Sequence, residues 1–315
     1  MVNLTRASRE LFSRTPDERF QSLDELRTHC HNERRFSTER WQVPQSMLPR
    51  AESDTVVLTL GDDEPCRLND WSFGQLCRMS GISKDTIVQL SPATASLALR
   101  ETLPAAEKPI QILTAGQTVR SMHGVSYTRL WNADLLNVVA NYATDFQPPP
   151  SGFNGATGLY CGEQDLFAFL IDPDGWVEID NEAFAPGFFV WNSEVGRRTL
   201  GIQTFWFQAI CQNHIVWDAT EVVEFTRKHT ASVQDGLIEI GRMIERLVAQ
   251  RDARRDGFFK VIRSAMSAQL GQDADEALKT LLEHGIPRGL SKEAVELTKT
   301  QGRFTVFALV ERSPD

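Results

Sequence analysis

Hydrophobic and polar positions alternate most clearly in the centre of the chain, between residues 187 and 230. An apolar run at residues 188–191 stops at Asn192-Ser193, and a second apolar stretch begins at Leu200. From Leu200 onward, large side chains fall on both faces that an extended strand would present. The pattern predicts two strands joined by a turn, in a sheet that is covered on both sides, with further strands at residues 215–217 and 221–225.

The same two-residue period precedes this region. Residues 110–113 and 117–127 predict a hairpin that turns at Ala115-Gly116. Residues 158–161, 166–171 and 176–179 predict shorter strands, and Asp172-Pro173-Asp174-Gly175 has the composition of a tight turn. We therefore expect an antiparallel meander, preceded by a long loop at residues 147–158 in which three prolines are followed by three glycines.

A helical period dominates both flanks of this β-rich centre. Behind a strand at residues 55–60, capping residues and turn glycines predict three short helices, at residues 70–79, at 84–90 and from residue 92. The spacing of Cys77, Gly81, Ile87 and Leu90 matches a helix-turn-helix, but any three short helices with a glycine corner fit this spacing.

The C-terminal third has a single long apolar stripe. Apolar residues recur every three or four positions at residues 233–248, which predicts a long amphipathic helix. Gly257 predicts an interruption, after which the helix continues to Met266 and shorter helices follow at residues 274–283 and 291–300. Residues 304–310 predict a final strand or a buried apolar segment.

Together these patterns predict an α+β fold: a central, largely antiparallel β-sheet with an N-terminal helical module and C-terminal helices. Residues 1–54 are rich in Arg and Glu, and we expect them to form an arm that packs late or on a partner. Residues 55–105 are expected to hold the strand and three-helix module, 106–232 the antiparallel β core, and 233–315 the long helix, the short helices and the final strand.

Charge is distributed unevenly over the 315 residues, whose formal net charge is −9. Between Arg129 and Arg197 there is no Lys or Arg but there are ten Asp and Glu residues. From Arg197 to Arg263, eleven Lys and Arg residues outnumber eight Asp and Glu residues. A locally basic surface can therefore exist on an acidic chain, although the overall charge argues against non-specific coating of polyanions.

Compartment and membrane association follow from simpler counts. The five cysteines are widely spaced and form no CxxC pair, which indicates reduced thiols. No apolar run approaches the roughly 18 residues that span a bilayer, and the first twenty residues contain no apolar stretch of signal-peptide type. We expect a cytoplasmic protein without a membrane partner.

Several longer motifs resemble one known family. WNSEVG at residues 191–196, CQNHIVW at 211–217 and RKHT at 227–230, together with WSFGQLCRMSGIS at 71–83 and VRSMHGVSYTRLWNADLL at 119–136, resemble the phage/plasmid-related family called domain of unknown function 932. The resemblance covers most of the chain from about residue 70, in the same order. It implies a setting, mobile genetic elements and their bacterial hosts, but it supplies no catalytic residues.

The candidate binding residues are cations beside aromatic rings. Arg120 and Arg129 lie in and after a predicted strand, close to Tyr127. Guanidinium groups bind phosphates and rings stack on bases, so this arrangement is typical of single-stranded nucleic-acid sites, and equally of an ordinary sheet edge. The full candidate set for nucleic-acid binding is Arg120, Tyr127, Arg129, Arg197, Arg198, Arg227, Lys228 and His229.

Catalytic and metal chemistry have weaker support. The chain contains no P-loop, dinucleotide-binding, HExxH, GxSxG or deaminase motif, so we predict no cofactor and assign no catalytic residues. His29-Cys30-His31 has zinc-ligand side chains, but no second Cys/His pair completes the site, and we predict no metal. The residues with enzymatic potential are Glu194, Cys211, His214, Asp218 and His229, near the ends of the central strands.

Three functional hypotheses remain. The leading hypothesis is a non-catalytic accessory protein of phage or plasmid DNA metabolism that binds single- or double-stranded nucleic acid, as a homo-oligomer such as a ring. The second is an enzyme that processes a nucleotide or nucleic acid through Glu194, Cys211 or His214. The third is a structural or host-modulating protein that binds a basic host protein through the acidic segment at residues 131–194.

Overall fold

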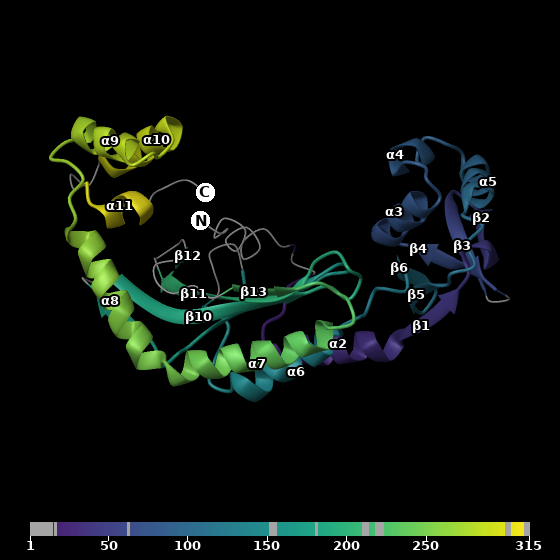
Figure 1. The fold of residues 1–315 in the computed structure, drawn as a ribbon, viewed down its shortest axis with the longest axis horizontal. Helices are drawn as coiled ribbons and strands as arrows, with labels where there is room; N and C mark the ends of the chain where they lie inside the picture. The colour runs from purple at the N-terminus through teal and green to yellow at the C-terminus, as the bar shows by residue number, and fades with distance from the viewer. Residues whose placement is uncertain are drawn as a thin grey trace.

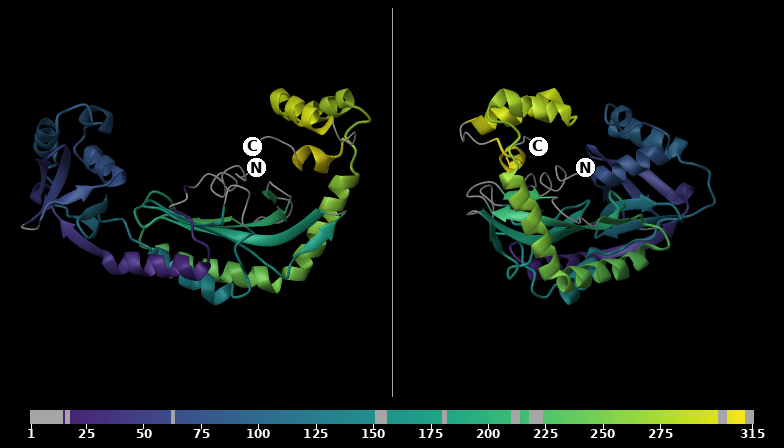
Figure 2. Two further views of the ribbon diagram at one scale, coloured as in Figure 1. Left: turned by 180° about the vertical axis from the view of Figure 1, so that it is seen from behind. Right: turned by 60° about the vertical axis from the view of Figure 1, so that its left-hand side comes forward.

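The computed structural model has an α+β fold with two β-sheets, each of which carries its own helices. It describes residues 15, 18–61, 64–150, 156–179, 182–209, 214–217, 224–299 and 304–311. The smaller sheet and its helices lie at one end of the molecule and the C-terminal helices at the other, with the larger sheet between them (Figure 1, Figure 2). The predicted fold class is confirmed, and the strands form two sheets.

We call residues 37–123 the small lobe. Its six-stranded sheet has the order β1-β5-β6-β4-β3-β2, and only the β4–β6 pair is parallel. The strands are β1 (Ser37–Gln42), β2 (Met47–Glu52), β3 (Thr55–Leu60), β4 (Cys66–Leu68), β5 (Ile110–Ala115) and β6 (Thr118–His123), with the short helix η2 (Pro44–Ser46) between β1 and β2. The helices α3 (Asp70–Met79), α4 (Lys84–Ile87) and α5 (Pro92–Thr102) bury their apolar sides against this sheet.

The small sheet divides the chain differently from the predicted segments. Residues 37–52, expected in an N-terminal arm, form β1 and β2, and the hairpin β5–β6, expected in the central core, pairs with β1 and β4. The hydrophobic pattern failed at β1 because this edge strand has the sequence STERWQ and no fully buried position. An edge strand needs no continuous apolar face, so its pairing leaves little trace in the sequence.

The large lobe is built on an antiparallel sheet with the order β12-β11-β10-β8-β7, to which β9 and β13 add at β10 and β11. Its strands are β7 (Leu159–Cys161), β8 (Leu166–Ile171), β9 (Val177–Ile179), β10 (Glu182–Asn192), β11 (Leu200–Ala209), β12 (His214–Trp217) and β13 (Glu224–Arg227). The predicted pair of strands around Asn192-Ser193 is confirmed, because β10 and β11 pair from Phe184–Gln208 to Trp191–Gly201. The predicted meander is modified: β8 and β9 both pair with β10, which is long enough to hold them one after the other.

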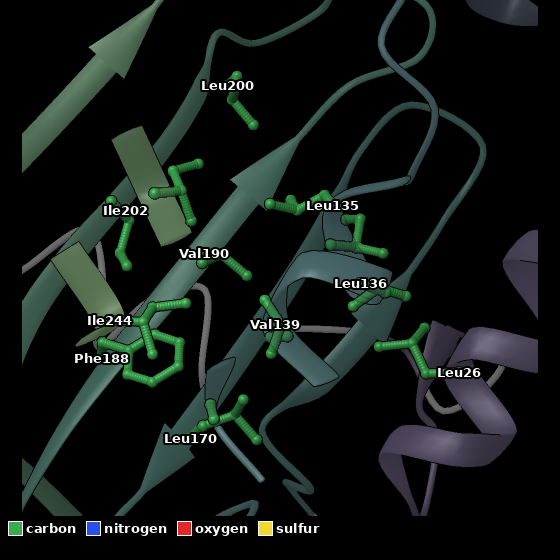
Figure 3. Close-up of a cluster of buried hydrophobic side chains, with 14 of the residues drawn as sticks. Leu26, Leu135, Leu136, Val139, Leu170, Phe188, Val190, Leu200, Ile202 and Ile244 are labelled. Atoms are coloured by element: carbon green, nitrogen blue, oxygen red, sulfur yellow. The ribbon is translucent and has the colours of Figure 1, made fainter. Parts of the chain in front are cut away.

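One face of the large sheet carries the main core. The helices α2 (Leu23–Phe36), α6 (Asn132–Tyr142) and α7 (Val233–Ala249) lie along this face (Figure 1). Figure 3 shows their buried side chains meeting those of β8, β10 and β11, among them Leu26, Val139, Ile244, Phe188 and Ile202. The other face buries a cluster of rings that includes Phe169, Phe189, Phe205 and Phe207, so the expectation of a sheet covered on both sides is confirmed.

The long C-terminal helix bends earlier than predicted. α7 ends at Ala249 and α8 (Arg251–Ser267) begins after Gln250, while Gly257 lies inside α8. The predicted interruption at Gly257 is wrong because packing sets the bend: Phe258 stacks on Trp206 of β11, with ring centroids 3.9 Å apart and ring planes 9° apart. The bend carries α8 past the end of the sheet (Figure 1).

The remaining helices form a C-terminal cluster, which contacts the large lobe through Phe307 of α11. α9 (Ala274–Glu283), α10 (Arg288–Thr298) and α11 (Val306–Glu311) pack through their own buried residues. Of the two predictions for residues 304–310, the strand is wrong and the buried apolar segment is confirmed, because Phe304, Phe307 and Leu309 are buried and α11 is helical. Within the described parts of the chain, no helix combines the length and apolar character that crossing a bilayer requires.

Stacking of Phe258 on Trp206 should hold α8 against the sheet. Phe258 is fully buried, so Phe258→Ala leaves a cavity and is expected to lower the free energy of unfolding by about 3–5 kcal/mol. Phe259→Ala is the matched control, because the ring of Phe259 is only partly buried against the same cluster. This substitution should lower the free energy of unfolding by about 1 kcal/mol. Urea unfolding of the three proteins measures both values, and equal losses would contradict the packing explanation.

Candidate functional site

The loop between β10 and β11 docks into the junction of the two lobes. The chain crosses this junction at Phe36–Ser37, where α2 runs directly into β1, and again at residues 124–131, between β6 and α6. The carbonyl of Val195 accepts a hydrogen bond from Trp71 Nε1 at 2.8 Å and lies 2.9 Å from His123 Nε2. Gly196 follows with φ +71°, and a Cβ there would lie 2.6 Å from His123 Cε1, so glycine is required for both reasons.

Glu194 places a carboxylate inside this junction. The residue is 2% exposed, and its Oε2 lies 3.1 Å from Nη1 of Arg120 on β6. Its Oε1 accepts a hydrogen bond of 2.9 Å from the backbone N–H of Asn132, the first residue of α6. Glu194 therefore caps α6 from the sheet loop, at the positive end of the helix dipole. Burial raises the pKa of Glu194, while Arg120 and the Asn132 N–H act in the opposite direction.

Arg129 is the second internal cation of the junction. It is 5% exposed, its Nε donates to Glu39 Oε1 at 2.5 Å, and its Nη2 donates to Gln111 Oε1 at 3.1 Å. Its Nη1 also donates to the backbone carbonyl of Glu194. Glu39 lies on β1 and Gln111 on β5. Arg129 therefore connects these two neighbouring strands of the small lobe to the β10–β11 loop of the large lobe. We call Arg120, Arg129, Glu194, Glu39 and Asn132 the junction cluster.

A stack of rings lies beside the junction cluster. The Tyr127 ring lies against His123, with centroids 3.7 Å apart, and against His229, with centroids 5.4 Å apart. The Tyr127 hydroxyl donates to the carbonyl of Glu194 at 2.8 Å. Burial lowers the pKa of His123 to about 4 and that of His229 to about 4, and the charge of Arg129 acts in the same direction on both. Burial raises the pKa of Tyr127. Both histidines are therefore neutral at physiological pH.

Two exposed arginines lie close to the ring of Trp71, at the outer edge of the junction. The guanidinium carbon of Arg78 lies 5.3 Å from the centre of the Trp71 ring, and that of Arg197 lies 5.4 Å from it. Both arginines are exposed, and neither has a carboxylate partner among the residues that the structure describes. We call Trp71, Arg78 and Arg197 the Trp71 cluster. Trp71 and Arg78 are not among the predicted site residues, although their spacing of seven residues places them two turns apart on one side of α3.

The predicted nucleic-acid-binding residues therefore separate into buried and accessible groups. Arg120, Tyr127, Arg129 and His229 do come together, and Arg129 lies 5.4 Å from the Tyr127 ring, but their side chains lie inside the protein or are partly buried in the junction. Arg198 pairs with Asp165, and Arg227 lies over Phe225 on β13. Arg197 and Lys228 are exposed. Folding thus places the two central guanidinium groups against carboxylates inside the protein.

Residues of the acidic segment and of the predicted helix-turn-helix also form ion pairs within the chain. In the acidic segment, Asp134 pairs with Arg34 at 2.7 Å and Asp165 with Arg198, so part of its charge is used within the chain. α4 has four residues, and its Lys84 bonds Asp70, which leaves a helix too short to read a DNA groove.

The residues with enzymatic potential are only partly described. Cys211 and Asp218 lie outside the described residues, and His214 is described only as part of β12. Glu194 serves as a buried cap and ion-pair partner. No group of three His, Cys, Asp or Glu side chains within the described ranges is arranged to hold a metal. Of the His29-Cys30-His31 sequence, His31 contacts Asn137 at 3.2 Å and Cys30 is buried.

Removing the charge of Glu194 should destabilise the protein strongly. Glu194→Gln leaves Arg120 buried beside a neutral amide, and loss of one partner of a buried ion pair costs about 3–5 kcal/mol. Glu33→Gln is the matched control, because Glu33 lies 3.6 Å from the same guanidinium with a side chain that is 39% exposed. That substitution should cost about 1 kcal/mol or less. Urea unfolding tests this order, and a Glu194→Gln protein as stable as Glu33→Gln would contradict the role of the cluster.

The neutral histidines should make stability depend on pH. Each takes up a proton near pH 6.5 in the unfolded chain but only near pH 4 in the folded protein. Between these values the unfolded state binds more protons, so the free energy of unfolding falls as the pH falls from 6.5 to 4. Urea midpoints across this range should decline less steeply for His123→Asn and His229→Asn than for the exposed control His284→Asn. Equal slopes in all of these proteins would exclude both histidines as the cause.

The chain was compared with protein families, curated proteins and solved structures. No protein-family model, curated protein or solved structure matches the chain. The functional interpretation therefore depends on two features of the lobe junction. In its interior the charges are paired, and at its outer edge two exposed arginines lie close to the ring of Trp71.

Proposed function

We propose that this protein is a non-catalytic accessory factor of phage or plasmid type that binds nucleic acid at the Trp71 cluster. The observation that carries the proposal is the approach of two exposed guanidinium groups, from Arg78 and Arg197, to one indole ring. The resemblance of residues 71–83 and 191–196 to the phage/plasmid-related family supports the setting, because the same two motifs contribute Trp71, Arg78 and, at the next position, Arg197.

An arginine beside an indole ring remains able to bind phosphate. Contact through the face of the guanidinium leaves its N–H groups free to donate to two phosphate oxygens. Two such groups on one ring provide cations on both of the elements that meet at the junction, α3 of the small lobe and the β10–β11 loop of the large lobe. A phosphate backbone that contacts both would therefore bridge the lobes.

Lys228 is a further exposed cation next to a residue of the junction. It precedes His229, whose ring stacks on Tyr127 in the junction. By contrast, Arg120 and Arg129 would have to leave their carboxylate partners to reach a phosphate, at the cost of breaking a buried ion pair. The proposal therefore assigns phosphate contacts to Arg78, Arg197 and Lys228, and assigns a structural role to the buried pair.

Salt-dependent binding of labelled oligonucleotides tests the proposal. The wild-type protein should bind single- or double-stranded DNA at low ionic strength, with an affinity that falls as salt is added. Arg78→Gln and Arg197→Gln should each weaken binding and make the slope of log K against log salt shallower by about 1.

Arg50→Gln provides the matched control for charge. Arg50 is exposed on β2, the edge strand at the opposite side of the small sheet from β1, and its loss should leave both affinity and salt slope unchanged. Fluorescence anisotropy at four or more salt concentrations gives both quantities. A wild-type protein that does not bind at low ionic strength, or Arg78→Gln and Arg197→Gln proteins that bind like Arg50→Gln, would refute the proposal.

A further inference from the structure

Two buried cysteines lie in contact behind the junction cluster. Cys30 of α2 and Cys161 of β7 are separated by 131 positions in the sequence, yet their sulfur atoms lie 4.0 Å apart. Cys30 is 1% exposed and Cys161 is 9% exposed. Cys66 and Cys77 make no such contact with another sulfur within the part of the chain that the structure describes.

The surroundings of the pair favour a thiolate at Cys161. The thiol of Cys30 donates to its sulfur at 4.0 Å, Asn132 Nδ2 donates to it at 3.8 Å, and the charge of the neighbouring His29 also acts on it. The Cys30 contact lowers the pKa of Cys161 and the neighbouring His29 acts in the same direction, although burial opposes both. The same contact and burial raise the pKa of Cys30. Cys161 is therefore the cysteine of the pair that more readily forms the nucleophilic thiolate.

We propose that Cys30 and Cys161 form a peroxide-sensitive redox pair, in which His29 activates Cys161 and Cys30 resolves the oxidised sulfur into a disulfide. The Cys161 thiolate attacks one oxygen of hydrogen peroxide, the O–O bond breaks, and the hydroxide that leaves takes up the proton lost from Cys161. Cys30 then attacks the sulfenic sulfur, and its thiol proton leaves with the hydroxyl as water. Two thiols lose two electrons, and peroxide becomes two water molecules.

Geometry makes the second step short. The sulfur atoms must approach from 4.0 Å to a bond length of about 2.05 Å, a change within reach of side-chain rotation and a small backbone shift. The resulting bond would join α2 to β7. Because α2 runs without interruption into β1 and its Glu33 faces Arg120, this bond would fix the small lobe on the large lobe.

Peptide mapping of the folded, full-length protein tests the pair. The reduced protein is treated with hydrogen peroxide, the remaining thiols are blocked with iodoacetamide, and the protein is digested and analysed by mass spectrometry without reduction. We expect a linked peptide pair that contains Cys30 and Cys161, released by dithiothreitol, together with a rise in the thermal midpoint. If the folded wild-type protein yields no such link, or yields it only in urea, the proposal fails.

Matched variants assign the two roles. Cys30→Ser should accumulate a dimedone-reactive sulfenic acid at Cys161, and Cys161→Ser should show none at Cys30. Cys66→Ser should form the link like the wild type. The His29→Ala protein should form the disulfide several-fold more slowly than the wild type. The His31→Ala protein should form it at the wild-type rate, because His31 is exposed on the same helix. Sulfenic acid at Cys30 in place of Cys161, or equal rates in the two histidine variants, would overturn the assignment.

Discussion

The arrangement of the two lobes depends on one buried carboxylate, that of Glu194. A charge with 2% exposure is stable only where ions and N–H groups replace its water, and here those groups come from separate parts of the fold. Arg120 comes from the small sheet and the Asn132 N–H from the start of α6. Since both must be in place to offset the cost of burial, the carboxylate selects one relative position of the lobes. An apolar contact of the same size would tolerate a wider range of positions.

This constraint also determines which cations are accessible at the surface. Arg120 and Arg129 are held by Glu194 and Glu39, and their charge is directed into the protein. Arg78 and Arg197 lie one layer further out, where an indole ring orients them without neutralising them. Trp71 connects the two layers, because its N–H donates to the carbonyl of Val195, the residue next to Glu194. The position of the accessible arginines is therefore linked to the ion pair beneath them.

The sequence was most informative where local pattern and packing coincide. β10, β11 and α9 could be predicted because their apolar residues alternate or recur regularly and their ends carry turn or capping residues. β1 could not, because an edge strand with exposed polar residues resembles a loop in sequence. The bend at Gln250 could not either, because it depends on a stack between Phe258 and the distant Trp206. For the candidate site, the sequence indicated arginines beside rings, but an arginine that pairs with Glu39 or Glu194 across dozens of residues has the same local sequence as an exposed one.

Asn132 joins this junction to the cysteine pair. Its backbone N–H binds Glu194, its Nδ2 donates to the Cys161 sulfur, and its Oδ1 accepts from Asn192, the last residue of β10. The first turn of α6 therefore contacts the ion pair on one side and the thiol pair on the other. Because Cys30 lies on α2, which continues into β1, a change of covalent state at the sulfurs acts on the same helix and strand that the ion pair holds. The ion pair of Glu194 and the cysteine pair therefore both contact the segment from α2 to β1, which connects the two lobes.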